Sequence, residues 1–161
     1  MKILSLDQST KITGYSVFED GKLITYGILK ADKKEKNIVE RMCQMYFAIK
    51  KLYGKVKPNF VFIEDTQYQQ NFASFQSLSQ MQGVIMGILF EKDVGFQVVK
   101  PSTWKSGVGV RGRKRKEQKE NAIEIVKMIY KIDASEDEAE AILIGQWGSD
   151  ILNQGQKEMS T

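Results

Sequence analysis

The chain has 161 residues, of which 42% are hydrophobic and 27% are charged, as in an ordinary globular protein. A chain of this length typically forms one domain and is long enough to bury a sizeable core. It contains no histidine and a single cysteine, which excludes histidine-based catalytic triads, histidine and cysteine zinc sites, and an internal disulfide. No apolar run is long enough to span a membrane and the N-terminal residues do not resemble a signal peptide, so we expect a cytoplasmic protein without a membrane partner.

The first third of the sequence predicts an antiparallel meander followed by a helix. Apolar and alternating runs indicate strands at Lys2–Leu6, Thr13–Phe18 and Leu23–Leu29. Asp20-Gly21 lies between the second and third runs, and this pair is typical of a hairpin turn because it tolerates positive φ angles. From Asn37 to Tyr53, apolar residues recur every three or four positions, which predicts a helix.

The remainder of the sequence predicts two strands that alternate with helices. The continuous apolar run Phe60–Ile63 is typical of a central strand that is covered on both faces. We expect the other elements in this order: a helix over Phe72–Phe90, a strand over Phe96–Val99, a mobile glycine-rich loop over Ser106–Gly112, and helices over Lys116–Tyr130 and Ser135–Leu152. Ser135 and Glu138 have the spacing of a capping box at the start of the last helix.

This order of elements predicts an α/β fold with a five-stranded mixed sheet flanked by helices. The ribonuclease H-like fold uses the same order. We expect one domain of this type over residues 1–152, followed by a disordered polar tail over residues 153–161.

Four acidic side chains border apolar sequence in a way that indicates a metal site. Asp7 ends the first strand and Glu64 ends the central strand, where an ionised carboxylate near the core needs a cation or hydrogen-bond donors. Asp137 and Glu140 are three positions apart and therefore lie on one face of the last helix, whereas Glu138 projects away from it. Because the chain has no histidine, these oxygen ligands favour Mg²⁺ or Mn²⁺ over zinc.

Each acid also has a simpler interpretation. Asp7 could close an Asx turn, and Glu64 could form a salt bridge with a nearby lysine. Asp137 and Glu140 could be the acidic first turn that the helix dipole favours. The metal site is the interpretation that explains all four acids together.

Positive charge is concentrated in one short stretch near the glycine-rich loop. Its members are Arg111, Arg113, Lys114, Arg115, Lys116 and Lys119. We call these six residues the basic segment. Together with the net charge of +4, the basic segment indicates contact with the phosphates of a nucleic acid. The simpler alternative is a solvated start of a helix.

Four segments of the chain form a combination that is more specific than any one of them. They are Leu4–Tyr15, Phe62–Glu64, Val99-Lys100 and Asp137–Ala141. This combination resembles the successive motifs of RuvC-type Holliday junction resolvases, and in particular their phage-encoded branch, from Met1 to about Trp147. The chain departs from the family pattern in two places, because Gln8-Ser9 replaces the usual Pro-Gly and Glu140 replaces the usual aspartate.

The resemblance implies a ribonuclease H-like endonuclease that resolves four-way junctions, and other branched DNA, by paired symmetrical nicks. The expected products carry 5′-phosphate and 3′-hydroxyl ends. The resemblance also implies two Mg²⁺ ions per active site, for which Mn²⁺ substitutes, and no nucleotide cofactor. The metal ligands would be Asp7, Glu64, Asp137 and Glu140.

Further roles are implied for residues outside the acids. Lys100 and Lys116 would stabilise charge on the phosphate, and Tyr68 would open the junction, with Phe72 and Phe75 as competing candidates. Because one domain holds a single set of acids, paired nicks require a homodimer. We expect exposed apolar residues of the helix over 72–90 to form much of the dimer contact.

Three other functions fit part of the sequence. Actin-like sugar kinases and ATPases also place Asp and Ser or Thr after a strand, but they need two such domains and a glycine-rich adenosine motif. A non-catalytic protein that binds branched DNA would keep the fold and the basic segment without needing four acids. Another ribonuclease H-like nuclease, acting on RNA/DNA hybrids, would differ in its substrate.

Overall fold

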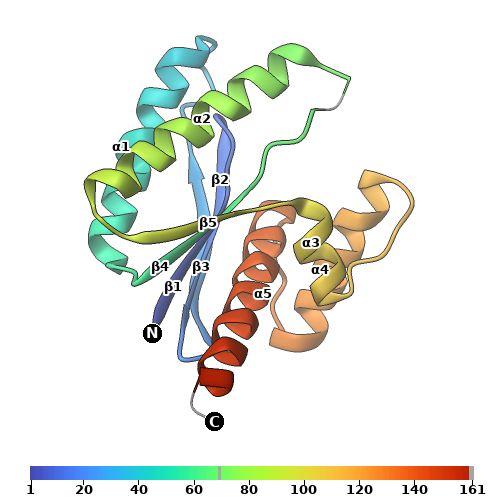
Figure 1. Cartoon of the computed structure of the whole chain (residues 1–161). Helices are drawn as coiled ribbons and strands as arrows, with labels where there is room; N and C mark the ends of the chain where they lie inside the picture. The colour runs from blue at the N-terminus through green and yellow to red at the C-terminus, as the bar shows by residue number, and fades with distance from the viewer. Residues whose placement is uncertain (69, 160–161) are drawn as a thin grey trace.

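The computed structural model describes residues 1–68 and 70–159 (Figure 1). Five strands form one mixed sheet in the order β3-β2-β1-β4-β5. They are β1 (Lys2–Asp7), β2 (Ile12–Glu19), β3 (Lys22–Lys30), β4 (Phe60–Glu64) and β5 (Gly95–Val99). The first three strands form the antiparallel meander, and β1, β4 and β5 run parallel. The predicted α/β fold with a five-stranded mixed sheet is confirmed.

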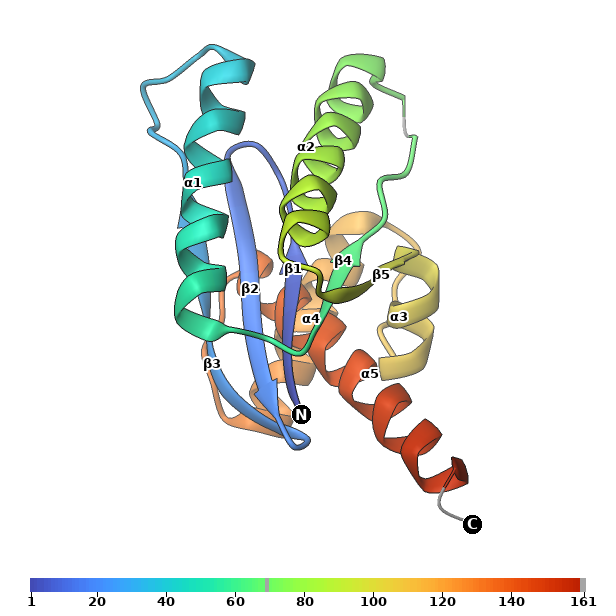
Figure 2. The same ribbon diagram turned by 60° about the vertical axis from the view of Figure 1, so that its left-hand side comes forward.

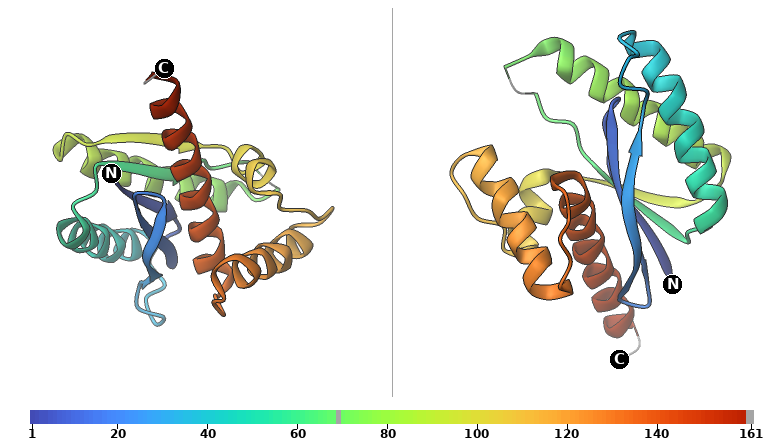
Figure 3. Two further views of the ribbon diagram at one scale, coloured as in Figure 1. Left: turned by 90° about the horizontal axis from the view of Figure 1, so that it is seen from below. Right: turned by 180° about the vertical axis from the view of Figure 1, so that it is seen from behind.

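Helices cover both faces of this sheet. They are α1 (Ile38–Val56), α2 (Phe72–Glu91), α3 (Pro101–Val108), α4 (Arg115–Tyr130) and α5 (Glu136–Met159). Figures 2 and 3 show α1 and α2 on one face and α5 on the other, and α3 and α4 pack beside α5. No described helix is both long and apolar enough to cross a membrane.

The alternation of side chains along β1 and β4 divides the core into two layers. Leu4 in β1 and Val61 in β4 belong to the layer beneath α1 and α2. Ile3 and Phe62 belong to the layer beneath α5. Because successive side chains of a strand point to opposite faces, every second residue of each strand faces α5.

Two expectations from the sequence are wrong in this region of the fold. Residues 106–108 belong to α3 and not to a mobile loop, because Pro101 starts this helix and the fully buried Trp104 anchors it. The last helix does not end at Leu152 but continues to Met159, so the tail is helical up to that residue. Its Gln, Lys and Glu residues are good helix formers, which accounts for the extension. Residues 160 and 161 of the expected tail lie outside the described residues.

Candidate active site

The carboxylates that end β1 and β4 lie side by side on the α5 face of the sheet. The alternation along each strand directs both Asp7 and Glu64 to this face. The parallel register pairs Leu6 with Ile63, so the residues that follow them are neighbours at the same edge. The two predicted strand-end acids are therefore brought together, as Figure 1 allows the reader to follow at the ends of β1 and β4.

Two buried serines fix the start of α5 against the sheet. The hydroxyl groups of Ser5 in β1 and Ser16 in β2 each donate a 2.8 Å hydrogen bond to the backbone carbonyl oxygen of Ala141. Ala141 follows Glu140 directly, and Glu140 is only 7% exposed. The serines therefore set the position from which α5 presents Glu140 to the strand ends.

Gly14 allows the first turn of α5 to approach β1 closely. It lies opposite Asp7 in the β1–β2 ladder. A Cβ atom at this position would lie 2.0 Å from the backbone carbonyl oxygen of Asp137, which is far inside van der Waals contact. Glycine is therefore the residue that lets Asp137 stand beside the end of β1.

Burial and mutual repulsion raise the pKa values of these carboxyl groups. The pKa of Asp7 lies well above its ordinary value because the group is buried and faces the charges of Glu64 and Glu140. Burial raises the pKa of Glu64, and the charge of Glu140 adds to the effect. Burial also raises the pKa of Asp137, against the opposing charge of Lys119. The site thus concentrates negative charge that a cation would neutralise.

A cleft of about 940 Å³ opens beside these acids and is lined by Glu64 and Glu140. One wall comes from α3, a helix that the sequence did not predict. Its Trp104 donates a 2.8 Å hydrogen bond from the indole nitrogen to Glu64 Oε1. The Nζ atom of Lys105 lies 3.8 Å from Glu140 Oε1 and donates a hydrogen bond to Gln118. Trp104 and Lys105 are therefore site residues that sequence reasoning missed.

The two lysines that the sequence nominated lie elsewhere. Lys100 is exposed at the residue before α3, and Lys116 is exposed on α4, where it pairs with Glu120. Neither is among the described residues that line the cleft. The sequence signal that could have identified Lys105 is Pro101, because proline is common at the first position of a helix. A helix that begins at Pro101 contains Lys105 one turn later.

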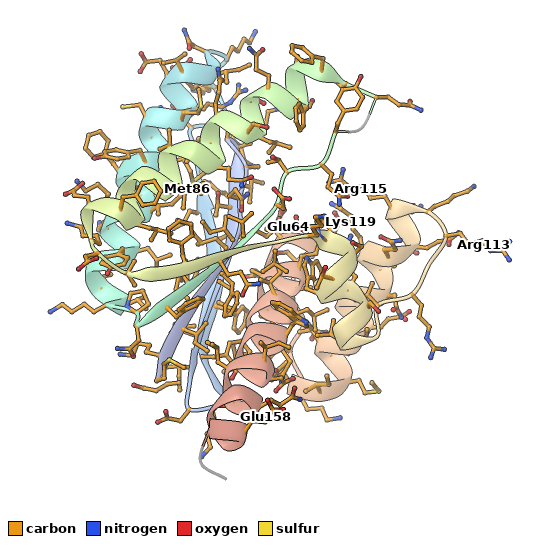
Figure 4. All side chains as sticks on the ribbon, viewed as in Figure 1. Glu64, Met86, Arg113, Arg115, Lys119 and Glu158 are labelled. Atoms are coloured by element: carbon orange, nitrogen blue, oxygen red, sulfur yellow. The ribbon has the colours of Figure 1, made fainter. Side chains whose placement is uncertain are left out.

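The basic segment is divided between the cleft and the solvent. Arg115 lines the cleft, whereas Figure 4 shows that Arg113 extends away from the molecule. Lys119 forms a 2.8 Å ion pair with Glu136 at the start of α5. Arg111 and Lys114 are exposed, as Lys116 is.

The aromatic candidates lie just before α2 and in its first turn. Tyr68 follows β4, is 65% exposed and packs edge-to-face against Phe75 at 5.6 Å between ring centroids. Phe75 lines the cleft, and Phe72 is exposed at the start of α2. Tyr68 as the junction-opening residue stays a prediction.

The donor set fits a divalent metal ion. It consists of carboxylate oxygens, which Mg²⁺ and Mn²⁺ prefer, and the repulsion among these carboxylates would be relieved by a bound cation. Among the described residues, no three Asp, Glu or Cys side chains are already arranged as a ligand set.

Carboxylates gathered from two strand ends and a crossing helix, beside a cleft with basic residues in its walls, define a metal-dependent nuclease of the ribonuclease H-like fold. Comparison with known families identifies the kind of nuclease. The family described as crossover junction endodeoxyribonuclease RuvC matches residues 3–145. The chain therefore belongs to the RuvC family, and the predicted resemblance to Holliday junction resolvases is confirmed.

Individual relatives agree with this assignment. The RuvC protein of Fusobacterium nucleatum is 27% identical over 148 residues, which cover 89% of this chain and 77% of the relative. That of Aliarcobacter butzleri is 32% identical over 122 residues, covering 73% of this chain and 78% of the relative. Because both relatives are bacterial, the phage-encoded branch stays a prediction.

Solved structures show the same fold. Thermus thermophilus RuvC in complex with a Holliday junction substrate superposes with a TM-score of 0.78 at 16% identity, over 96% of each chain. Fowlpox virus resolvase in complex with Holliday junction DNA superposes with a TM-score of 0.63 at 17% identity, over 94% of this chain and 99% of that one.

Proposed function

We propose that this chain, as a homodimer, resolves four-way DNA junctions by paired, metal-dependent nicks that leave 5′-phosphate and 3′-hydroxyl ends. The observation that carries the proposal is the meeting of Asp7, Glu64 and Glu140 beside a cleft that Glu64 and Glu140 line, in a RuvC-family fold. Two Mg²⁺ ions per active site are the proposed cofactor, and Mn²⁺ is the expected substitute.

The proposed division of labour follows from position. Asp7, Glu64, Asp137 and Glu140 would hold the ions, which supply an activated water and neutralise charge on the leaving oxygen. Trp104 orients the Glu64 carboxylate through its indole N–H. Lys105 lies within reach of both Glu140 and the cleft, where its ammonium group would stabilise charge on the phosphate.

The surroundings of the cleft suit a DNA backbone. Arg115 lines it, and the other residues of the basic segment extend the positive surface over the residues just before α4 and over its first turns. A second hollow of about 310 Å³ shares Ser74 and Leu78 with the cleft and is lined by Lys11 and Arg41. No Asp or Glu of the described residues lines this hollow. A DNA strand that continues from the cleft into this hollow would therefore meet further positive charge.

The proposed dimer contact lies on the outer side of α2. Phe72 and Phe90 are each 65% exposed there, although large apolar side chains are usually buried. A symmetric pair of subunits matches the two-fold symmetry of a four-way junction and places one acid set on each of two strands.

The first experiment compares cutting of synthetic four-way, three-way, flap and duplex DNA, and of an RNA/DNA hybrid, with and without Mg²⁺. We expect Mg²⁺-dependent cutting of the four-way junction, and loss of cutting but not of binding in Asp7→Asn. Binding without cutting by the wild type would favour a non-catalytic junction-binding protein. Preference for the hybrid would favour a different ribonuclease H-like activity.

A second experiment tests the paired sites. A mixed dimer of wild type and Asp7→Asn should nick one strand of a cruciform plasmid and fail to linearise it. Efficient linearisation by the mixed dimer, or a monomer in sedimentation with junction DNA bound, would contradict the paired-site mechanism.

A further inference from the structure

Gln8 occupies the position directly after Asp7 and is only 6% exposed, yet it helps to line the active-site cleft. Its amide nitrogen Nε2 donates a 2.5 Å hydrogen bond to the backbone carbonyl oxygen of Glu64. Because a carbonyl oxygen only accepts hydrogen bonds, this contact identifies the amide atom that faces Glu64 as the nitrogen. Gln8 thereby ties the end of β1 to the end of β4, between the two strand-end acids.

The other atom of the same amide has no partner. Gln8 Oε1 is buried and accepts no hydrogen bond from any described residue. Buried polar atoms are nearly always paired, because an unpaired one has lost its water without compensation. The side chain cannot turn Oε1 toward another donor without breaking the bond between Nε2 and Glu64. The wall of the cleft therefore holds a fixed, unused oxygen at the ends of β1 and β4, the strands that carry Asp7 and Glu64.

We propose that Gln8 Oε1 is a neutral oxygen ligand for the divalent ion held by Asp7 and Glu64. The inference rests on the proposed function and adds a residue to its metal site. Magnesium and manganese bind carbonyl oxygens as well as carboxylates. A neutral ligand adds a bond to the ion without adding to the repulsion among the carboxylates.

The test measures Mn²⁺ binding by calorimetry in the absence of DNA. Gln8→Met keeps the length of the side chain and removes the oxygen, so we expect the Mn²⁺ dissociation constant to rise about tenfold or more, the scale known for groups that support metal sites. Gln8→Glu keeps an oxygen and should bind Mn²⁺ at least as tightly as the wild type. Gln146→Met is the matched control, because Gln146 Oε1 already accepts a hydrogen bond from Tyr130 outside the cleft.

The contrast between the two variants separates metal binding from strand pairing. Both lose the bond that Nε2 donates to Glu64, so a purely structural role would lower both melting temperatures and leave both Mn²⁺ affinities at the wild-type value. That result would overturn the proposal. If the wild type itself bound no Mn²⁺, the proposed function would fail as well, whereas equal binding by wild type and Gln8→Met rejects the role of Gln8 alone.

A measurement on the wild type keeps the proposal testable if Gln8→Met does not fold. The side-chain amide signal of Gln8 in a ¹⁵N-glutamine-labelled sample should shift as Mg²⁺ saturates the site, while that of Gln146 stays in place. A Gln8 signal that does not move at saturating Mg²⁺ would contradict ligation.

Discussion

The acidic cluster, formed by Asp7, Glu64, Asp137 and Glu140, and the basic segment serve one cleft but are held in opposite ways. The acids are fixed by strand register, by alternation along the strands and by two serines that anchor α5. Most side chains of the basic segment are exposed, although the backbone amides of Arg113 and Lys114 donate hydrogen bonds to Glu117. We infer that the acids act as a unit, so that loss of any one of them removes most of the cleavage rate. The basic residues instead make separate, additive contributions to the affinity for DNA.

The sharpest test of this contrast compares two neighbouring acids on α5. Glu140→Gln should lower the rate of junction cutting by about a thousandfold, since a metal site supplies several kcal/mol of transition-state stabilisation and about 4 kcal/mol corresponds to that factor. Glu138→Gln should be nearly silent, because Glu138 accepts hydrogen bonds from Ser135 in a capping box that glutamine also completes. Single-turnover cleavage of a labelled four-way junction measures both.

The outcome also tests the helical register. Circular dichroism should show that both variants remain folded, so that a loss of rate reports on the site. A stronger effect of Glu138→Gln than of Glu140→Gln would show that the acidic cluster has been assigned to the wrong face of α5.

Much of the acidic cluster could be predicted because its geometry is encoded locally. Strand ends are visible as the ends of apolar runs, and the spacing of Asp137 and Glu140 defines a helix face. The capping box of Ser135 and Glu138 is confirmed for the same reason. These features depend on neighbours in the sequence, so tertiary packing did not need to be known.

The parts that escaped prediction depend on contacts between distant segments. Trp104 and Lys105 reach the acids because α3 folds against α5, and the residues just after them were predicted to form a loop. Lys100 was chosen from its place in a motif, but the structure leaves it exposed. The hydrogen bond from Gln8 to Glu64 likewise joins residues that are far apart in the sequence.

A second prediction compares the lysine that the structure places in the cleft with the one that the sequence nominated. Lys105→Met should lower the cleavage rate by about a hundredfold, the lower end of the range for removing one charge-stabilising donor. Lys100→Met should have little effect on the rate. The pH-independent single-turnover rate at saturating Mg²⁺ measures the difference. Equal losses in the two variants would show that position relative to Glu140 does not decide the role of a lysine here.

Neutralising the basic segment should have a smaller and graded effect. Replacing Arg111, Arg113 and Lys114 with glutamine should weaken junction binding about tenfold and reduce the dependence of log affinity on log salt by about one unit per lost phosphate contact. Each single variant should contribute a share of this loss. Fluorescence anisotropy over a series of salt concentrations measures the affinity and the slope of log affinity against log salt. An unchanged slope in the triple variant would mean that these residues are solvated and do not contact phosphates.

The smallest expected effect concerns the stability of the acidic cluster itself. Because burial and the charges of Glu64 and Glu140 raise the pKa of Asp7 in the folded protein, the folded state holds a proton that the unfolded chain releases. The stability that this proton provides is complete below the ordinary Asp pKa of about 3.9 and is lost as the pH rises through the raised folded value. Asp7→Asn removes this loss of stability, because asparagine carries no charge at any of these pH values. In EDTA at pH 7 its melting temperature should exceed that of the wild type by a few degrees, at about 2–4 °C per kcal/mol for a chain of this size.

Two controls bear on this last effect. The difference in melting temperature should shrink as the pH falls toward and below the ordinary Asp pKa of about 3.9, because Asp7 of the wild type then becomes protonated in the unfolded state as well. Added Mg²⁺ should stabilise the wild type more than Asp7→Asn, because an ion that binds the folded protein shifts the equilibrium toward it. An Asp7→Asn protein less stable than the wild type in EDTA at pH 7 would mean that neighbouring groups already compensate the Asp7 carboxylate, and that the acidic cluster does not depend on a metal ion for its neutralisation.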